Sequence, residues 1–177
     1  FNRKQLKALR VYLERGGFRG LERVLKKMEP REVVREITES GIRGRGGAGF
    51  PTGKKWEMVA SSKEKTKYII CNGDEGDPGA FMDRMLLESY PFRILEGIIA
   101  AGYAVGASEG ILYIRAEYPL AVQRILEAID IMREQGYIGK NILDSGFDFD
   151  LSVYQGAGAF VCGEETALME SIEGRRG

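Results

Sequence analysis

The chain has 177 residues, of which 44% are apolar, and its 26 Lys plus Arg residues balance its 26 Asp plus Glu residues. This length and apolar content suffice for one globular domain with a real core, and zero net charge gives no indication of nucleic-acid or membrane binding. The chain has no histidine and only two cysteines, Cys71 and Cys162, which excludes histidine acid–base catalysis, a disulfide scaffold and a self-contained iron–sulfur cluster.

Residues 1–40 have the patterns of helices. Apolar residues recur at helical spacing in QLKALRVYLERGG and FRGLERVLKKM. In EPREVVREITESG, Pro30 stands at a first-turn position and Gly41 at a C-terminal capping position. We therefore expect a helical segment over residues 1–40, followed by an α/β domain over residues 41–177.

A glycine-rich stretch with adjacent cations follows, GIRGRGGAGFPTGKKW over residues 41–56. Backbone without side chains can approach a ligand closely, and nearby Lys and Arg side chains favour a ligand that carries phosphate. Residues 44–49 match G-x-G-x-x-G, but a dinucleotide fingerprint should follow a strand, and here a helix precedes it. The stretch matches the P-loop motif G-x-x-x-x-G-K-[ST] only in part, because Ala48 replaces its first glycine and Lys55 replaces its final Ser or Thr. A flexible turn remains the alternative interpretation.

The rest of the chain alternates between strands and helices after a short helix at 54–62. Buried strands are expected at 67–72, 111–116 and 147–155, and helices at 91–106, 118–136 and 164–174. This order predicts a parallel sheet with helices on both faces, a three-layer α/β domain. In such sheets the ligand lies beyond the carboxyl ends of the strands.

Two acidic segments narrow the type of ligand. GDEGDPGAFMD (73–83) does not have calcium-loop spacing, but its carboxylates could accept hydrogen bonds from ribose, ribityl or flavin ring groups. Glu164 and Glu165 begin a helix after a second glycine loop (156–163) and would repel a phosphate there. A solvated turn and a favourable helix-dipole interaction are the alternatives for these two segments. We place phosphate near the first glycine loop and sugar or ring near the second.

The stretches GRGGAGFPTGKKW, CNGDEGDPGAFMDR, YIRAEYPLAV and GAGAFVCGEETALMESIEG resemble the FMN- and NADH-binding subunit of respiratory complex I. They also resemble the diaphorase subunits of NAD(P)-linked, often electron-bifurcating, hydrogenases and formate dehydrogenases. The resemblance implies a Rossmann-like FMN domain, with a ubiquitin-like domain and a [4Fe–4S] domain in a C-terminal part outside this chain. It further implies NAD(H) or NADP(H) as the second ligand, and no metal within these residues.

The resemblance also assigns cofactor-binding residues, matched motif by motif. The glycine loop that touches NADH and flavin, with the lysine that contacts flavin, supplies Gly44, Arg45, Gly46, Gly47, Ala48, Gly49, Phe50 and Lys55. The acidic loop supplies Asn72, Asp74, Glu75, Gly76 and Asp77, and the second wall of the pocket supplies Phe160, Gly163, Glu164 and Glu165. Glu165 is expected to face both flavin and nicotinamide. Two departures from the family pattern are Phe160, where Tyr is usual, and Met58, where Phe is frequent.

The implied activity is hydride transfer from nicotinamide C4 to flavin N5, in which the cofactor carries the chemistry and no residue serves as a general acid. The implied partners are iron–sulfur subunits: a thioredoxin-like [2Fe–2S] subunit and a cluster subunit of a hydrogenase, formate dehydrogenase or complex I. The expected location is the cytoplasm, or the cytoplasmic face of a membrane complex, without membrane insertion. The alternatives are a peripheral flavin subunit of a membrane ion-pumping complex and a non-catalytic nucleotide-binding assembly module.

Overall fold

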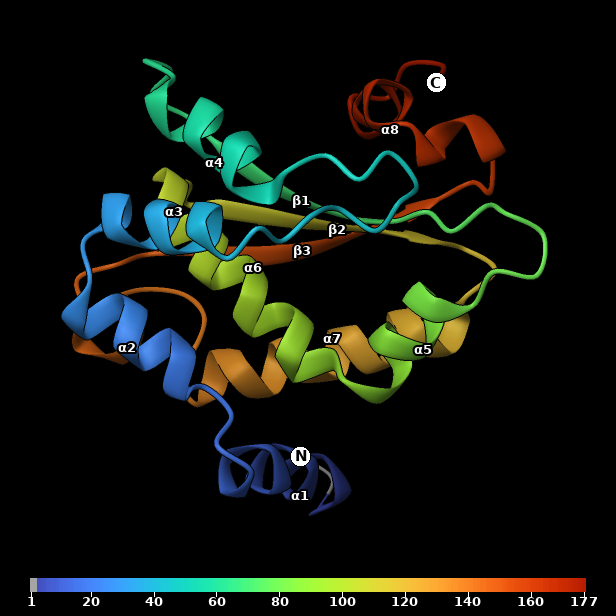
Figure 1. The fold of residues 1–177 in the computed structure, drawn as a ribbon. Helices are drawn as coiled ribbons and strands as arrows, with labels where there is room; N and C mark the ends of the chain where they lie inside the picture. Colours follow the sequence, from blue (N-terminus) through green and yellow to red (C-terminus); the bar gives the residue numbers. More distant parts are fainter. Residues whose placement is uncertain (1–2) are drawn as a thin grey trace.

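The computed structural model describes residues 3–177, and their side chains from Leu6 onward. Eight α-helices and three strands follow one another along these residues (Figure 1). They are α1 (Arg3–Glu14), α2 (Arg19–Lys27), α3 (Pro30–Glu39), α4 (Thr52–Ser61), β1 (Tyr68–Gly73), α5 (Met82–Ser89), α6 (Pro91–Val105), β2 (Glu109–Arg115), α7 (Pro119–Glu134), β3 (Asp150–Gly156) and α8 (Glu165–Ile172). Short 3-10 helices cover Ile142–Asp144 and Phe160–Gly163.

The three strands form a parallel sheet in the order β1-β2-β3. Tyr68 of β1 lies opposite Glu109 of β2, which in turn lies opposite Asp150 of β3. Parallel neighbours require crossover connections, which α5 and α6 provide between the first pair and α7 between the second. This is the predicted α/β architecture, and the three predicted strands are confirmed.

The helices form layers on the two faces of the sheet. Alternate residues of β2 separate them: Leu112 and Ile114 belong to the main core with α6 and α7, whereas Tyr113 packs with Leu168 of α8 on the other face. Figure 1 shows α6 and α7 below the sheet and α8 above it. The three-layer prediction is therefore confirmed, although the crossover helices α5, α6 and α7 share one face and α8 covers the other.

The N-terminal helices contact α6 through one half-buried acceptor, Glu96. Glu96 accepts hydrogen bonds from the backbone N–H groups of Phe18, at 3.0 Å, and Leu21, at 3.1 Å, at the start of α2, and also from the Tyr12 hydroxyl of α1. Helix N-termini leave unpaired N–H groups, and here a carboxylate from α6 satisfies two of them. The apolar side chains of Leu21 and Leu25 join the main core, so this core includes part of the N-terminal segment.

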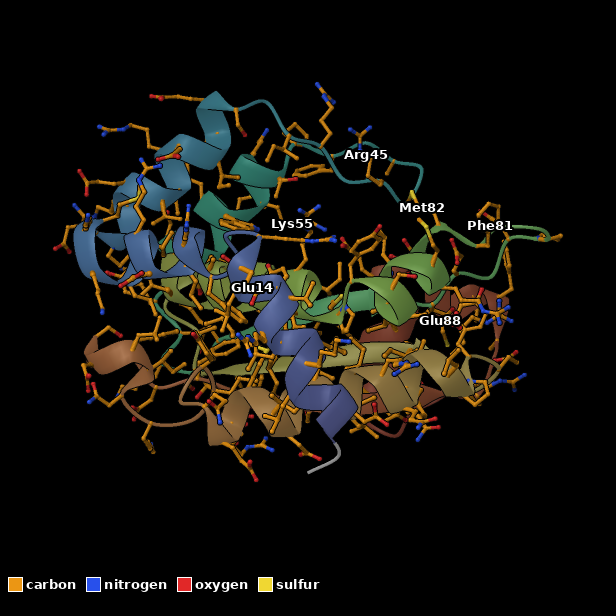
Figure 2. All side chains as sticks on the ribbon, turned by 90° about the horizontal axis from the view of Figure 1, so that it is seen from below. Glu14, Arg45, Lys55, Phe81, Met82 and Glu88 are labelled. Carbon is orange, nitrogen blue, oxygen red and sulfur yellow. The ribbon has the colours of Figure 1, made fainter. Side chains whose placement is uncertain are left out.

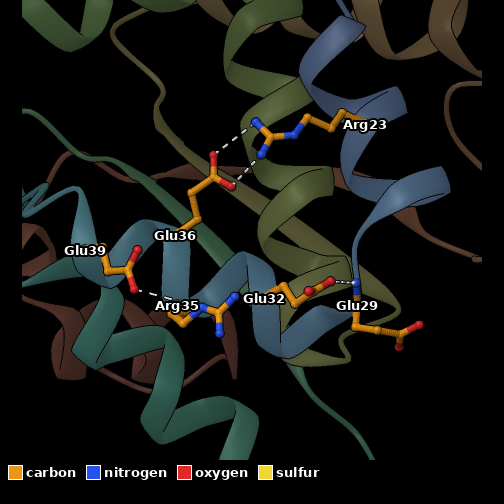
Figure 3. A network of polar contacts seen from close by, with 6 residues as sticks. All are labelled: Arg23, Glu29, Glu32, Arg35, Glu36 and Glu39. Atoms are coloured by element: carbon orange, nitrogen blue, oxygen red, sulfur yellow. Dashed lines mark hydrogen bonds and ion pairs between the residues drawn. The ribbon is translucent and has the colours of Figure 1, made fainter.

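An ion pair on the surface, between Arg23 and Glu36, connects α2 with α3 (Figure 3). The Arg23 guanidinium donates two hydrogen bonds to the Glu36 carboxylate, at 3.2 and 2.9 Å. At the start of α3, the Glu32 carboxylate accepts from the Glu29 N–H at 2.8 Å, as one half of a capping box. Pro30 occupies the first helical turn and Gly41, with φ 66°, follows the end of the helix, as the sequence predicts.

One helix departs from the sequence prediction. Residues 82–89 form α5, where the sequence led us to expect the end of an acidic loop and then an unassigned segment. The acidic loop is therefore shorter than predicted and ends at Phe81. The helix that closes the loop is also tied back to it, because the Glu75 carboxylate accepts from the Asp83 N–H.

Candidate functional site

Three loops form the candidate site, and two of them leave the carboxyl ends of parallel strands. The acidic loop follows β1, the second glycine loop follows β3, and the first glycine loop leads into α4. In Figure 2, Arg45 of the first glycine loop lies at the same end of the molecule as Phe81 and Met82, where the acidic loop ends. Loops at this edge of a parallel sheet form the crevice in which α/β proteins bind ligands.

The first glycine loop is held at its base and open along its tip. Gly44 donates its N–H to the Phe50 carbonyl at 2.9 Å, and the Arg43 guanidinium donates to the Gly49 carbonyl at 2.8 Å. Gly47 has φ 101° and Gly49 has φ 60°, a left-handed region that favours glycine. A Cβ atom built on Gly46, Gly47 or Gly49 would meet no heavy atom of the described residues within 4 Å. This backbone therefore faces free space.

Lys55 and Glu165 connect opposite sides of the site. Lys55 extends from α4 beneath the first glycine loop (Figure 2), and its Nζ lies 2.7 Å from Oε2 of Glu165, the first residue of α8. The same ammonium lies 5.9 Å from the ring centroid of Phe50. Both partners of the ion pair are exposed, so the pair contributes little to stability but is accessible to a ligand. The structure thus brings together the two residues that the sequence placed on opposite walls.

Asn72 and Asp74 lie where the acidic loop contacts the second glycine loop. The Asn72 amide donates to the Gly163 carbonyl at 2.8 Å, and its oxygen accepts from the Asp74 N–H at 3.0 Å. Asp74 is only 8% exposed, and its Oδ2 has no hydrogen-bond partner among the described residues. Burial raises the pKa of this carboxyl, the Arg115 guanidinium lowers it and Glu117 raises it. An unpaired buried carboxylate oxygen is costly, and a donor from a ligand would satisfy it.

The Glu75 carboxylate caps α5. Its Oε1 accepts from the Asp83 N–H at 3.0 Å, and its Oε2 accepts from the Arg84 N–H at 3.2 Å and from the Tyr118 hydroxyl at 3.3 Å. These bonds already use the carboxylate that the resemblance assigned to a flavin ligand, so that assignment stays a prediction. Asp77 is exposed farther along the loop, and its carbonyl accepts from the Ala80 N–H.

The second glycine loop packs closely against the acidic loop. A Cβ atom on Gly76 would lie 3.0 Å from the Phe160 ring, and one on Gly163 would lie 3.4 Å from the Asp74 carbonyl. Glycine at these positions therefore permits the two loops to touch. Phe160 itself is 67% exposed beside this contact. The proximity of Gly76 and Gly163 to the other loop is consistent with the predicted site, but a packing role accounts for both glycines.

Glu164 is the N-cap of α8. Its carboxylate accepts from the backbone N–H groups of Thr166, at 3.0 Å, and Ala167, at 3.1 Å, and from the Thr166 hydroxyl. These hydrogen bonds hold the pKa of Glu164 below its ordinary value. The structure therefore favours the helix-terminus alternative for Glu164, whereas Glu165 faces Lys55 across the site.

Glu164 should make the stability of the protein depend on pH. A carboxyl with a lowered pKa in the folded state contributes stability above its unfolded pKa, and this contribution is lost as pH falls through the folded value. The melting temperature of the wild type should therefore fall more than that of Glu164→Gln, which cannot titrate, as the pH is lowered from about 5 to below about 4. Equal pH slopes for the two proteins would contradict the capping role.

A cavity of about 940 Å³ lies elsewhere, among the N-terminal helices and α6. Tyr12, Leu21, Val24, Trp56 and Phe92 are among the residues that line it. Among the residues that the structure describes, those predicted for the site do not line this cavity. This cavity is therefore separate from the candidate site.

Arg115 and Tyr118 contact the site, although the sequence assigned no role to either. Both donate to the Glu75 carbonyl, and Arg115 also donates to Glu117 at 2.8 Å. The signal was present in YIRAEYP, where an arginine ends a buried strand at the edge that carries the ligand loops. Only the fold shows that this arginine reaches the acidic loop.

Comparison with known proteins adds independent information. The family model described as the Nuo51 FMN-binding domain matches residues 37–177. The chain is 56% identical over 166 residues to the NADP-reducing hydrogenase subunit HndC of Solidesulfovibrio fructosivorans, covering 94% of this chain and 34% of that protein. It is 50% identical to an NADH-quinone oxidoreductase subunit of Aquifex aeolicus, covering 94% of this chain and 38% of the relative. The chain thus spans roughly a third of the length of these curated relatives.

A solved structure extends the likeness to three dimensions. The crystal structure of an NAD⁺-reducing [NiFe]-hydrogenase in the H₂-reduced state superposes with a TM-score of 0.75 at 39% identity, covering 87% of this chain and 26% of that one. Among residues 3–177, no helix combines the length and apolarity that crossing a membrane requires. Because the family model covers the whole candidate site and the fold agrees with that of a solved relative, the chain belongs to the family of Nuo51 FMN-binding domains.

Proposed function

We propose that this chain forms the FMN- and nicotinamide-binding part of an NAD(P)H-oxidising electron-transfer enzyme. The observation that carries the proposal is the convergence of an open glycine loop, an exposed lysine and a buried unpaired carboxylate oxygen at one sheet edge. The relatives named as NADH-quinone oxidoreductase and NADP-reducing hydrogenase subunits support the same chemistry. We propose that this part lies in the cytoplasm, or on the cytoplasmic face of a membrane complex.

The residues present fit FMN. The space beside Gly46 and Gly47 admits a group that approaches backbone N–H donors closely, and Lys55 supplies a cation for a phosphate or a ring oxygen. The free Oδ2 of Asp74 offers an acceptor for a hydroxyl or ring N–H of the ligand. When bound, FMN exchanges a hydride with nicotinamide and electrons with iron–sulfur clusters, so the protein needs only to bind, orient and exclude water.

We further propose that electrons leave toward iron–sulfur centres outside the described residues. These would include a [4Fe–4S] cluster elsewhere in the same polypeptide, a thioredoxin-like [2Fe–2S] subunit, and a cluster subunit of a hydrogenase, formate dehydrogenase or complex I. The subunit names of the relatives support membership in such an assembly.

Flavin release tests the proposed function directly. Denaturing the purified protein and chromatographing the released flavin should yield FMN rather than FAD. NADH or NADPH should then reduce ferricyanide in the presence of the native protein. A folded protein that releases no flavin or mainly FAD would overturn the proposal, and a colourless protein that binds nucleotide would support the assembly-module alternative.

Glu165→Gln should change substrate kinetics more than stability. The substitution removes the charge that pairs with Lys55, and an exposed ion pair contributes only about 0–1 kcal/mol to folding. A Lys55 ammonium released from this pair can interact differently with flavin and nicotinamide. The Michaelis constant for NADH and the flavin reduction potential should shift, while the melting temperature changes little. Unchanged kinetics with clearly lower stability would instead assign Glu165 to the helix terminus alone.

A further inference from the structure

Arg115 and Tyr118 form a clamp under the acidic loop. Arg115 ends β2 and Tyr118 is the N-cap residue of α7, so each adjoins an element of the sheet and helix framework. The Arg115 guanidinium lies over the Tyr118 ring, 5.6 Å from its centroid. Tyr118 is buried, and the Arg115 side chain is 18% exposed. Stacking and burial therefore fix the orientation of both polar groups.

The clamp converges on one peptide group. The Glu75 carbonyl accepts from Arg115 Nη1 and from the Tyr118 hydroxyl, the latter at 3.3 Å. The single Tyr118 O–H is shared between this carbonyl and the Glu75 carboxylate, which also lies 3.3 Å from the hydroxyl and caps α5. One arginine and one tyrosine thus hold both the backbone and the side chain of Glu75, the residue that follows Asp74.

The position of Asp74 depends on this arrangement. Its buried Oδ2 lacks a partner among the described residues, and its backbone carbonyl lies beneath the Gly163 loop. Arg115 acts on the Asp74 carboxyl at longer range, since its charge lowers the pKa that burial raises. A shift of the Glu75 peptide would therefore move the free carboxylate oxygen relative to Lys55 and the glycine loop.

We propose that Arg115 and Tyr118 are positioning residues that hold the acidic loop in its ligand-binding conformation by fixing the Glu75 peptide. This inference rests on the proposed function and assigns a role to YIRAEYP that the resemblance left open. Neither side chain needs to touch the cofactor. Both act through the loop, so their removal should weaken flavin binding without unfolding the protein.

Two conservative variants test the clamp. Arg115→Lys keeps the charge but loses the planar fork, and Tyr118→Phe keeps the ring but loses the hydroxyl. Each should raise the FMN dissociation constant, measured by flavin fluorescence quenching, by about tenfold or more, as expected for one lost charge-assisted or buried hydrogen bond. The visible circular dichroism of the bound flavin should also change. Arg133→Lys is the matched control, because Arg133 pairs with Asp150 at 2.7 Å at the opposite end of the strands.

The double variant separates positioning from general structure. Because both groups hold the same carbonyl, their effects on the FMN dissociation constant should be less than additive. Variants that melt at lower temperature but bind FMN like the wild type would overturn the clamp and leave the proposed function standing. Additive losses would mean that the two residues act independently, which also overturns it. A wild-type protein that binds no flavin would overturn the proposed function, and this inference with it.

Discussion

Replacing Gly47 with valine should abolish flavin retention while leaving most of the fold intact. Gly47 has φ 101°, and a Cβ atom there would point into free space rather than into the protein. A branched side chain would fill the space that the ligand needs, and it would disfavour the backbone conformation at a cost of about 1–3 kcal/mol. The purified variant should be colourless and should not oxidise NADH, while its far-ultraviolet circular dichroism remains that of the wild type.

Gly139→Val is the matched control for this experiment. Gly139 has φ 110°, and a Cβ atom there would also meet nothing within 4 Å in the described part of the chain. It lies in the connection between α7 and β3, outside the predicted site. The control should lose comparable stability and keep its flavin. A Gly47→Val protein that folds, stays yellow and oxidises NADH would show that the first glycine loop is only a connector.

Gly53→Ala, in the same glycine-rich stretch, should lower stability and keep flavin binding, the opposite of what we expect for Gly47→Val. A Cβ atom on Gly53 would lie 2.3 Å from Thr38 Oγ1 and 2.5 Å from Thr38 Cα, so α3 and α4 would have to separate. We expect the free energy of unfolding to fall by about 1–3 kcal/mol through overpacking, despite the higher helix propensity of alanine. Denaturant unfolding measures this loss. The residual folded protein should still bind flavin, because Gly53 is buried between helices rather than exposed to the ligand.

Gly97→Ala supplies the comparison for Gly53. Gly97 also lies within a helix, α6, but a Cβ atom there would meet nothing within 4 Å of the described residues. The substitution should be neutral or should stabilise the protein by up to about 1 kcal/mol, the propensity difference alone. If both variants were equally stable, close approach of α3 and α4 could not be the reason for glycine at position 53.

The sequence predicts the framework well because its signals are local. Pro30 and Gly41 mark the ends of α3 within a few residues, and alternation in the third strand identifies β3. The sequence does not predict α5, because the residue that caps this helix is not next to it in the chain. N–H groups of its first turn donate to Glu75, which lies before the helix in the acidic loop. No pattern within MDRMLLES reveals that partner, so the segment looks unassigned when considered alone.

For the site residues too, the motifs predict some features, and others are visible only in the fold. Motif resemblance assigns Lys55 and Glu165 to one site, and in the fold Lys55 Nζ lies 2.7 Å from Glu165 Oε2. Resemblance does not show which structural contacts the neighbouring acids make. In the fold, Glu164 caps α8 and Glu75 caps α5, while Oδ2 of Asp74 has no partner among the described residues. Those differences arise from tertiary contacts, which a motif does not contain.

The register of the parallel sheet also determines when the site can form during folding. Pairing Tyr68 with Glu109, and Glu109 with Asp150, closes two loops of roughly forty residues each, and such non-local contacts slow folding. The acidic loop follows β1 and the second glycine loop follows β3. These two sides of the site therefore cannot come into contact until β3 has paired with β2. During synthesis, the cofactor could bind only after residues beyond 156 had left the ribosome. Flavin would therefore bind only to chains in which the sheet is already complete.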